Sequence, residues 1–313
     1  MSTGYSQPLS LGWNRMKKAL FQPFDINKWF RVGFTAWLAG MTDCHGGSNG
    51  NNSGNGIHDP WNEFFNFPQN AWNWLMDNPL WFNLIIVGLI LLFIIITIVT
   101  WVSSRGKFMF LHNVVHDSSE ISKPWNEYSK EGNSLFIFQF FYGWVAFAAF
   151  IAFAVYCFLT AKTLYYGDFP NIAIFWSVAL MILIFIGYLI VFGYISLFLK
   201  DFVVPIMYKH RVGVMRGWGR FLRLMFPRFF SFIGYGLFIF VLGIAVAFSV
   251  MFLALLTCCI GLLLIVIPYI GAVILLPVSY TFRAFSVEFL RQFGAEYDVF
   301  PQPETDNQEI ITN

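Results

Sequence analysis

Two histidines, His112 and His116, stand four residues apart in a segment that we predict to be helical. Residues four apart lie on the same face of a helix, and two imidazoles in that arrangement can bind zinc. Zinc proteases with such a pair place a glutamate directly after the first histidine, whereas this chain has Asn113 there. We therefore favour two histidines at a membrane surface and keep a metal site of a membrane enzyme as the alternative.

A second group of possible metal ligands brackets a stretch rich in glycine and asparagine. Its members are Asp43, Cys44, His45, His58 and Asp59. The flexible spacer between the two halves adds an ordering cost to any site that they form together. The chain contains no nucleophile elbow, phosphate-binding loop or dinucleotide fingerprint. We therefore expect no catalytic residue and no cofactor, with the two histidine-containing groups as the enzymatic alternative.

The composition is typical of a membrane protein, since 58% of the 313 residues are hydrophobic, 20% aromatic and 12% charged. Soluble domains carry roughly 25% charged and about 45–50% apolar residues. The mean hydropathy is +0.63. These values exclude a soluble enzyme, a disordered chain and a disulfide-stapled secreted domain, and the net charge of +2 gives no reason to expect nucleic acid as a partner. We predict an all-α, polytopic transmembrane helical bundle that forms a single membrane domain over residues 1–313.

Membrane spans are predicted where about 20 apolar residues occur together, enough helix to cross a hydrocarbon core of roughly 30 Å. The uncharged region from Phe229 to Phe282 is too long for one crossing, so we expect a hairpin that turns near Thr257–Gly261. Arg31 interrupts the first candidate span, which makes that span the weakest. The six predicted spans are residues 29–41, 81–101, 135–161, 172–199, 229–256 and 262–286.

The basic residues favour an orientation with both ends of the chain in the cytoplasm, because Lys and Arg concentrate on that side of a membrane. Residues 1–31 carry five of them, 102–134 carry four and 200–228 carry seven, whereas the loop 42–80 carries none. With six crossings, 18 of the 19 basic residues face the cytoplasm and only Lys162 lies outside. The cytoplasmic segments are then 1–27, 102–134, 200–228 and 287–313, and the outer loop is 42–80.

Two cytoplasmic segments have the residue spacing of helices that lie along a membrane surface. In the first, over residues 9–22, apolar and polar side chains take opposite faces before Pro23; the alternative is a flexible tail. Its apolar face comprises Leu9, Trp13, Met16 and Leu20, and its polar face comprises Arg15, Lys18 and Gln22. The segment 104–134 is expected to hold two short helices, one over Arg105–His116 and one from Ser122 to about Gly132.

The most basic segment is predicted to form a further helix of this kind after Gly213. Its apolar stripe comprises Val214, Trp218, Phe221 and Met225, and its basic stripe comprises Arg216, Arg220 and Arg223. Each basic residue near an anionic membrane adds about 1 kcal/mol to binding. We therefore take Arg216, Trp218, Arg220 and Arg223 as candidate residues for anionic lipid headgroups or an acidic partner. The alternative is that they serve only to fix the orientation of the chain.

The outer loop ends in a segment, residues 60–81, that is crowded with aromatic rings. Its candidate binding residues are Trp61, Trp72 and Trp74. Tryptophan gathers at the headgroup level of membranes, so we favour an outer aromatic belt. Because tryptophan also dominates binding hot spots, the alternative is a patch that binds another membrane protein or a second copy of this chain.

Three short stretches carry a resemblance to known sequences: Phe21–Phe30, Asp201–Met207 and Arg283–Leu290. Together they resemble a group of uncharacterised bacterial six-span membrane proteins. Residues 200–290 are also similar to the membrane region fused to some glycerophosphodiester phosphodiesterases. The acidic metal-binding clusters of those phosphodiesterases have no counterpart in this sequence. The resemblance implies a bacterial inner membrane and supplies no catalytic residue.

These observations lead to two main functional hypotheses. The first is a non-enzymatic interaction or envelope-maintenance component that uses the basic helix 208–228 on the inner face and the aromatic segment 60–81 on the outer face. The second is a transporter or channel for lipid-like or neutral solutes, whose cavity would be lined by tyrosines such as Tyr142 and Tyr188. No Asp, Glu, Lys, Arg or His lies in the central turns of any predicted span, which counts against ion-coupled transport.

Overall fold

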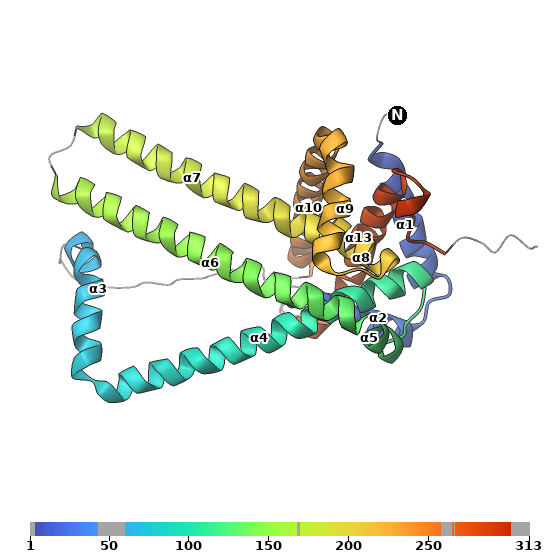
Figure 1. Cartoon of the computed structure of the whole chain (residues 1–313), viewed down its shortest axis with the longest axis horizontal. Coiled ribbons are helices and arrows are strands. Elements are labelled where there is room, and N and C mark those ends of the chain that lie inside the picture. Colours follow the sequence, from blue (N-terminus) through green and yellow to red (C-terminus); the bar gives the residue numbers. More distant parts are fainter. Residues whose placement is uncertain (1–3, 43–59, 168–169, 258–264, 266, 302–313) are drawn as a thin grey trace, which may run out of the picture. The chain divides into compact units, whose positions relative to one another are not determined.

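The computed structural model of the chain describes residues 4–42, 60–167, 170–257, 265 and 267–301 (Figure 1). Every regular element in these ranges is a helix, which confirms the predicted all-α class. The chain divides into two compact units. Unit 1 comprises the described parts of Met1–Met41, Val102–Phe136 and Ser196–Asn313, and unit 2 comprises those of Thr42–Trp101 and Ile137–Ile195.

Four helical runs among the described residues are long and apolar enough to cross a membrane. Two are single helices of 38 residues, α4 (Pro79–His116) and α6 (Ser129–Tyr166), each about 57 Å long at 1.5 Å per residue. The third run comprises α7 (Asn171–Phe198), η1 (Leu199–Val203) and α8 (Val204–His210). The fourth comprises α9 (Val214–Met225), η2 (Phe226–Arg228) and α10 (Phe229–Leu256). A hydrocarbon core is roughly 30 Å thick, so each run is longer than one crossing requires.

Two of the six predicted spans correspond to shorter helices in the described part of the chain. α2 (Ile26–Gly40) covers nearly all of 29–41 with 15 residues, fewer than a perpendicular crossing requires. Within 262–286 the chain forms α12 (Pro268–Ile274) and α13 (Leu276–Arg291), which are separated at Leu275. Pro277 accounts for the interruption, because a proline ring clashes with the carbonyl four residues earlier and has no N–H to donate.

Unit 2 is built from α3 (Pro60–Asp77), most of α7 and the parts of α4 and α6 that lie outside unit 1. Phe65 of α3 is buried, and its ring centre lies 5.7 Å from that of Phe158 and 5.3 Å from that of Tyr165 on α6. Most apolar side chains of α4 and α7 in this unit are exposed. Apolar surfaces of this extent mark contact with a membrane or with other proteins.

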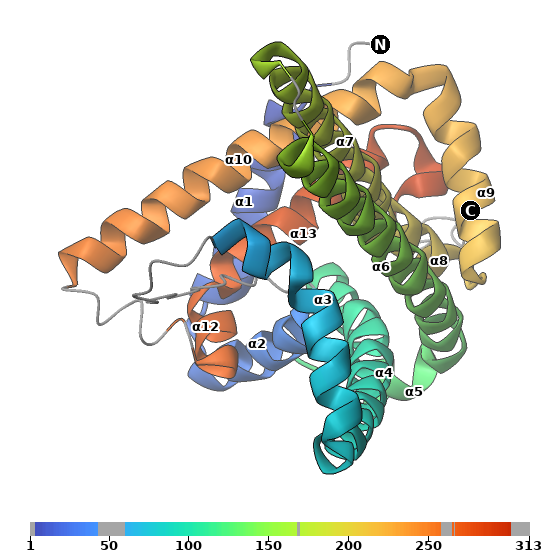
Figure 2. The same cartoon turned by 90° about the vertical axis from the view of Figure 1, so that its left-hand side faces the viewer.

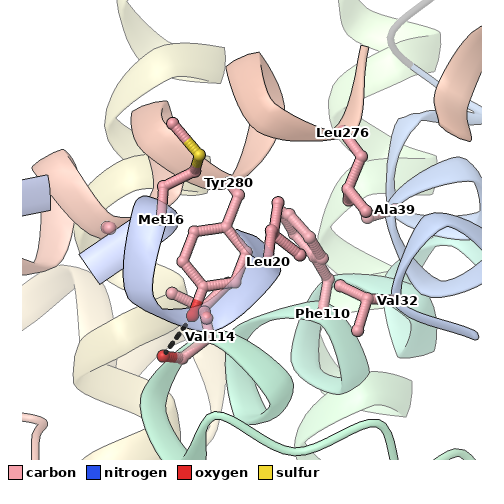
Figure 3. Close-up of a cluster of buried hydrophobic side chains, with 10 residues drawn as sticks. Met16, Leu20, Val32, Ala39, Phe110, Val114, Leu276 and Tyr280 are labelled. Carbon is pink, nitrogen blue, oxygen red and sulfur yellow. Dashed lines mark hydrogen bonds between the residues drawn. The ribbon is translucent and has the colours of Figure 1, made fainter. Parts of the chain in front are cut away.

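Unit 1 contains a buried apolar core, drawn in Figure 3. Its side chains come from α1 (Ser6–Phe21), α2, the end of α4 and α13, and they include Met16, Leu20, Phe110 and Tyr280. The Tyr280 hydroxyl donates to the carbonyl of Val114 at 3.3 Å, the dashed line in Figure 3. α1 packs along α13, and α12 packs along α2 (Figures 1 and 2).

The N-terminal helix packs on α13 through small residues and part of its predicted apolar face. Gly12 lies so close to α13 that a Cβ there would be 2.9 Å from the backbone nitrogen of Phe285. Met16 is buried as predicted, but Trp13 is 47% exposed and Arg15 contacts α13. Met16 and Leu20 of the predicted apolar face are therefore in the core of unit 1, Trp13 is exposed, and Arg15 of the predicted polar face pairs with Glu288 of α13. Because α1 packs on α13, the middle of its buried face lies at Gly12, the small residue that lets the two backbones approach.

α2 lies alongside the end of α4. Ser103 donates from its Oγ to the carbonyl of Ala39 at 3.1 Å, and the Lys28 ammonium pairs with Asp117 at 2.8 Å. One predicted span, 29–41, is thus beside residues 102–117, which we predicted to lie outside the membrane.

The segment after the second predicted span is organised differently from expectation. α4 continues without a break through Arg105–His116, which we predicted as a separate helix. α5 (Ser122–Glu127) begins at the predicted residue, but it ends before Gly132, which lies inside α6. Gly132 has a packing role instead, because a Cβ there would be 2.9 Å from Cγ of Arg105. Reading this glycine as a helix end was therefore wrong.

A single π-helical turn, η1, joins α7 to α8. Pro205 has no N–H, so the α-helical hydrogen bond to the carbonyl of Asp201 cannot form, and a π turn accommodates the gap. The turn buries Asp201 and Phe202. α8 then ends at His210 and is followed by Arg211, which has a left-handed φ of 51°. This arrangement positions Tyr208 in the interior of unit 1.

Candidate functional site

The apolar stripe of the basic helix α9 is covered by the protein itself. Phe221 stacks on Phe202 of η1 with ring centres 5.3 Å apart and an interplanar angle of 10°. Gly217 lies against α8, since a Cβ there would be 2.9 Å from Cγ of Met207. Val214, Phe221 and Met225 are buried as the spacing predicted, whereas Trp218 is only half-buried. The stripe is therefore not available to insert into lipid.

The opposite side of α9 presents guanidinium groups. Arg216 and Arg223 are exposed, and Arg220 is half-buried. Arg228, just after the helix, is also exposed, with its guanidinium 5.3 Å from the centre of the Phe293 ring. Burial lowers the pKa of His210, and the positive charge of Arg220 lowers it further. The surface of α9 is thus cationic, which suits contact with phosphate or carboxylate groups.

The two histidines at the end of α4 form a cluster with two tyrosines from other helices. The Tyr208 oxygen lies 3.0 Å from Nδ1 of His112 and 3.2 Å from Nδ1 of His116. A phenol has one hydrogen to donate, so one histidine must donate its own Nδ1 hydrogen to the phenol oxygen. Tyr128 stacks on Tyr208 with ring centres 4.6 Å apart, and Arg211 lies 3.9 Å above the Tyr128 ring. Sequence reasoning found the histidines but missed Tyr128 and Tyr208, since nothing local links the three segments.

This geometry is poorly arranged for a metal ion. The rings of His112 and His116 stack with centres 4.4 Å apart and an interplanar angle of 26°, and the Nδ1 atoms of both already contact the same phenol oxygen. Tetrahedral zinc requires converging ligands. Among the described residues, no group of three or more His, Cys, Asp or Glu side chains is placed to hold a metal. The other predicted group, Asp43 to Asp59, lies outside the described residues.

Acid is expected to destabilise unit 1 through His112. Burial lowers the pKa of His112 below its ordinary value of 6.5, with a smaller contribution from His116. The unfolded chain then binds a proton more readily than the folded one, so stability is lost as the pH falls below about 6.5. Thermal unfolding followed by tryptophan fluorescence should give a lower midpoint at pH 5 than at pH 7.5. In His112→Phe the difference should shrink, and an undiminished difference would assign it to other groups.

The tryptophans of the outer aromatic segment remain available for contact. Trp72 is 57% exposed and Trp74 is 51% exposed, and Trp74 lies 6.4 Å from Trp81 between ring centres. The side chain of Trp61 lies outside the described residues. The helix α3 thus presents two large rings, a feature consistent with both an outer headgroup belt and a partner-binding patch.

The tyrosines considered for a transport cavity form hydrogen bonds between helices. In unit 2, Tyr142 donates to the carbonyl of Phe192 at 2.5 Å and Tyr188 donates to the carbonyl of Ala146 at 3.2 Å. In unit 1, the Tyr235 hydroxyl donates to the buried carboxylate of Asp201 at 3.0 Å. Such bonds join neighbouring membrane helices. These hydroxyls therefore serve packing in this structure.

A buried ionic network in unit 1 was missed by sequence reasoning. The side chain of Glu288 is 1% exposed, and its two oxygens lie 2.5 Å from Nε of Arg15 and 3.6 Å from Nη1 of Arg291. Arg291 also pairs with Asp298 at 3.1 Å. The available signal was the position of Glu288 within an apolar face of α13, where a carboxylate requires a cationic partner. The network connects α1 to α13.

One family model, described as a family of unknown function (DUF7544), matches residues 8–287. The match covers α1 through most of α13 and therefore both units. No curated protein and no solved structure matches the chain.

Proposed function

We infer that this chain, which belongs to that family of unknown function, is an integral membrane protein that acts without catalysis, as an interaction or envelope-maintenance component. The four apolar helical runs support a place in the membrane. The resemblance to uncharacterised bacterial six-span proteins supports a bacterial inner membrane. The distribution of basic residues supports cytoplasmic ends and a cytoplasmic α9.

The observation that carries the proposal is the division of α9 into two faces with different partners. Its apolar face packs on η1 and α8 of the same unit, so the helix is held in place by protein contacts. Arg216 and Arg223 are exposed on this fixed support. A rigid row of guanidinium groups recognises phosphate or carboxylate at a lower ordering cost than a flexible tail. We propose that the row binds anionic lipid headgroups, and that Trp72 and Trp74 anchor the outer side.

The hydrogen-bonding of the tyrosines is the reason to prefer this role to transport of neutral solutes. Tyr142 and Tyr188 each satisfy a backbone carbonyl of the neighbouring helix. A solute passing along these helices would have to compete with those bonds. Transport through a tyrosine-lined cavity is therefore not supported by the described residues.

Removing the guanidinium row should reduce the anionic phospholipid that the protein retains. The test compares the triple variant Arg216→Gln, Arg220→Gln, Arg223→Gln with the wild-type chain after extraction from bacterial membranes. Each basic group near an anionic surface adds about 1 kcal/mol, so the three together predict a retained phosphatidylglycerol content reduced several-fold, with phosphatidylethanolamine unchanged. Lipid extraction and mass spectrometry measure both.

The matched control removes three exposed cations from other helices: Lys17→Gln, Lys18→Gln and Lys130→Gln. The control should retain phosphatidylglycerol as the wild-type chain does. An equal loss in both triple variants would mean that total charge, and not the α9 row, governs retention. No loss in either would contradict the proposed lipid contact.

A further inference from the structure

A surface cavity of unit 1 lies between α2 and the segment that joins α4 to α5. Its volume is about 530 Å³, and its lining residues are Arg31, Ser119, Glu120, Ile121, Ser122 and Lys123. Ligand sites commonly have volumes of about 300–1,000 Å³. The cavity is therefore large enough for a small charged ligand, and its polar lining sets the kind of ligand.

Arg31 is the charged residue that interrupts the apolar sequence of α2. Its side chain is exposed and makes no hydrogen bond or ion pair with the described residues. Lys28, one helical turn earlier, is by contrast paired with Asp117 at 2.8 Å. Arg31 thus brings an uncompensated guanidinium to the cavity, and the planar fork of its N–H groups matches two oxygens of one phosphate.

The other wall is fixed by the turn at the end of α4. Asp117 has a left-handed φ of 52°, and Ser118 donates from its backbone N–H to the carbonyl of Asn113 at 3.2 Å. The Ser118 hydroxyl also donates to the side-chain oxygen of Asn113 at 3.0 Å. These bonds hold the turn that leads into residues 119–123. The cavity therefore combines the guanidinium of α2 with two hydroxyls and an ammonium from a defined segment.

The charges of the lining favour an anion. Arg31 and Lys123 supply two positive charges, and Glu120 supplies one negative charge. The Lys123 ammonium lies 3.9 Å from Glu120, and these side chains are 69% and 50% exposed, so the pair is weak. A phosphate can take the place of this carboxylate beside Lys123 while it also pairs with Arg31. A neutral ligand would leave the guanidinium without a partner.

We propose that this cavity binds a phosphate group, carried either by a lipid headgroup or by a small soluble phosphate. Arg31 is the principal ligand, Lys123 is the second cation, and the hydroxyls of Ser119 and Ser122 donate to the remaining oxygens. The site is separate from the guanidinium row of α9, and its residues lie on different helices. Loss of binding at one surface therefore leaves the other intact.

Calorimetric titration of the purified full chain with inorganic phosphate, in detergent and phosphate-free buffer, tests the soluble source. Arg31→Gln removes charge-assisted hydrogen bonds and should weaken binding about tenfold. Arg31→Lys keeps the charge without the planar fork, so its phosphate affinity should lie between those of the wild-type chain and Arg31→Gln. Lys130→Gln removes an exposed cation outside the cavity and should bind as the wild-type chain does. Arg31 is itself exposed, so unchanged unfolding temperatures are expected and show that the variants fold.

Phospholipid analysis of the same preparations tests the lipid source. A headgroup ligand predicts that Arg31→Gln carries less phospholipid than Lys130→Gln, whereas a soluble ligand predicts equal phospholipid and a changed phosphate titration. The proposal is overturned if Arg31→Gln and Lys130→Gln agree in both measurements. The triple variant of the α9 row tests the lipid contact at α9 separately. If that variant loses phosphatidylglycerol while Arg31→Gln and Lys130→Gln agree in both measurements, the cavity proposal fails and the lipid contact at α9 stands.

Discussion

Replacing Gly106 with alanine is expected to destabilise the protein by about 1–3 kcal/mol, the usual cost of overpacking a close contact. A Cβ at this position of α4 would lie 2.6 Å from Cβ of Leu38 and 2.8 Å from the backbone nitrogen of Ala39. α2 cannot retreat freely, because Ser103 donates to the carbonyl of Ala39 at 3.1 Å. Chemical unfolding in detergent, followed by tryptophan fluorescence, measures the loss.

Gly219 provides the matched control for this substitution. It lies on the exposed side of α9, and a Cβ there meets nothing within 4 Å. Gly219→Ala should therefore stabilise the helix by about 0.5–1 kcal/mol, the ordinary advantage of alanine over glycine. The two substitutions are chemically identical and opposite in expected sign. If Gly106→Ala also stabilised the protein, the close approach of α2 and α4 would be wrong.

Glu288→Ala is expected to cause the second large loss, towards the lower end of the 3–5 kcal/mol that is typical when one member of a buried ion pair is removed. The carboxylate is 1% exposed, whereas its partners Arg15 and Arg291 are 38% and 48% exposed. After the substitution both guanidinium groups can recover part of their solvation from water, which limits the loss. The same unfolding measurement gives the size of the loss. The stability of Glu288→Gln should lie between those of the wild-type chain and Glu288→Ala.

Glu127→Ala is the comparison for a surface pair. Glu127 pairs with Arg211, and these side chains are 36% and 41% exposed. Exposed pairs contribute about 0–1 kcal/mol, so this variant should lose far less stability than Glu288→Ala. Equal losses in the two variants would show that burial of Glu288 does not determine its contribution.

The apolar helices of this chain could be predicted from the sequence because their signal is local. A run of about 20 apolar residues has few alternatives to a membrane-length helix. α10 begins and ends where the prediction placed it, at 229 and 256. Two features were harder to predict: the interruption of the last predicted span, and the continuity of α4 through residue 105. Composition alone does not distinguish the end of a helix from a helix that continues beyond the bilayer.

The packing of unit 1 could not be predicted, because it depends on contacts between distant segments. Arg15 has the spacing of a solvent-facing residue, and only the proximity of Glu288 makes it part of a buried network. Gly12 is an ordinary helix residue until α13 is known to lie against it. In both cases the residue type is readable in the sequence, but its partner is not.

The candidate sites also combine features that follow from local sequence patterns with features that depend on contacts between distant segments. The basic row of α9 follows from residues spaced by four and three, which is a local pattern. The covering of its apolar face by Phe202 and Met207 is a tertiary contact that the pattern did not contain. Likewise, His112 and His116 were visible as a pair, while the phenol of Tyr208 between them comes from a helix 92 residues further on.

The ionic link between α1 and α13 also has a consequence for biosynthesis. Arg15 and Glu288 are separated by 273 residues, so the ribosome completes α1 long before its partner exists. At about 5–20 residues per second, the buried face of α1 waits for roughly 14–55 s of translation. During that interval the apolar side chains of Met16 and Leu20 must be covered by lipid, by a chaperone or by other helices of the nascent chain. Unit 1 can therefore close only after α13 has emerged from the ribosome.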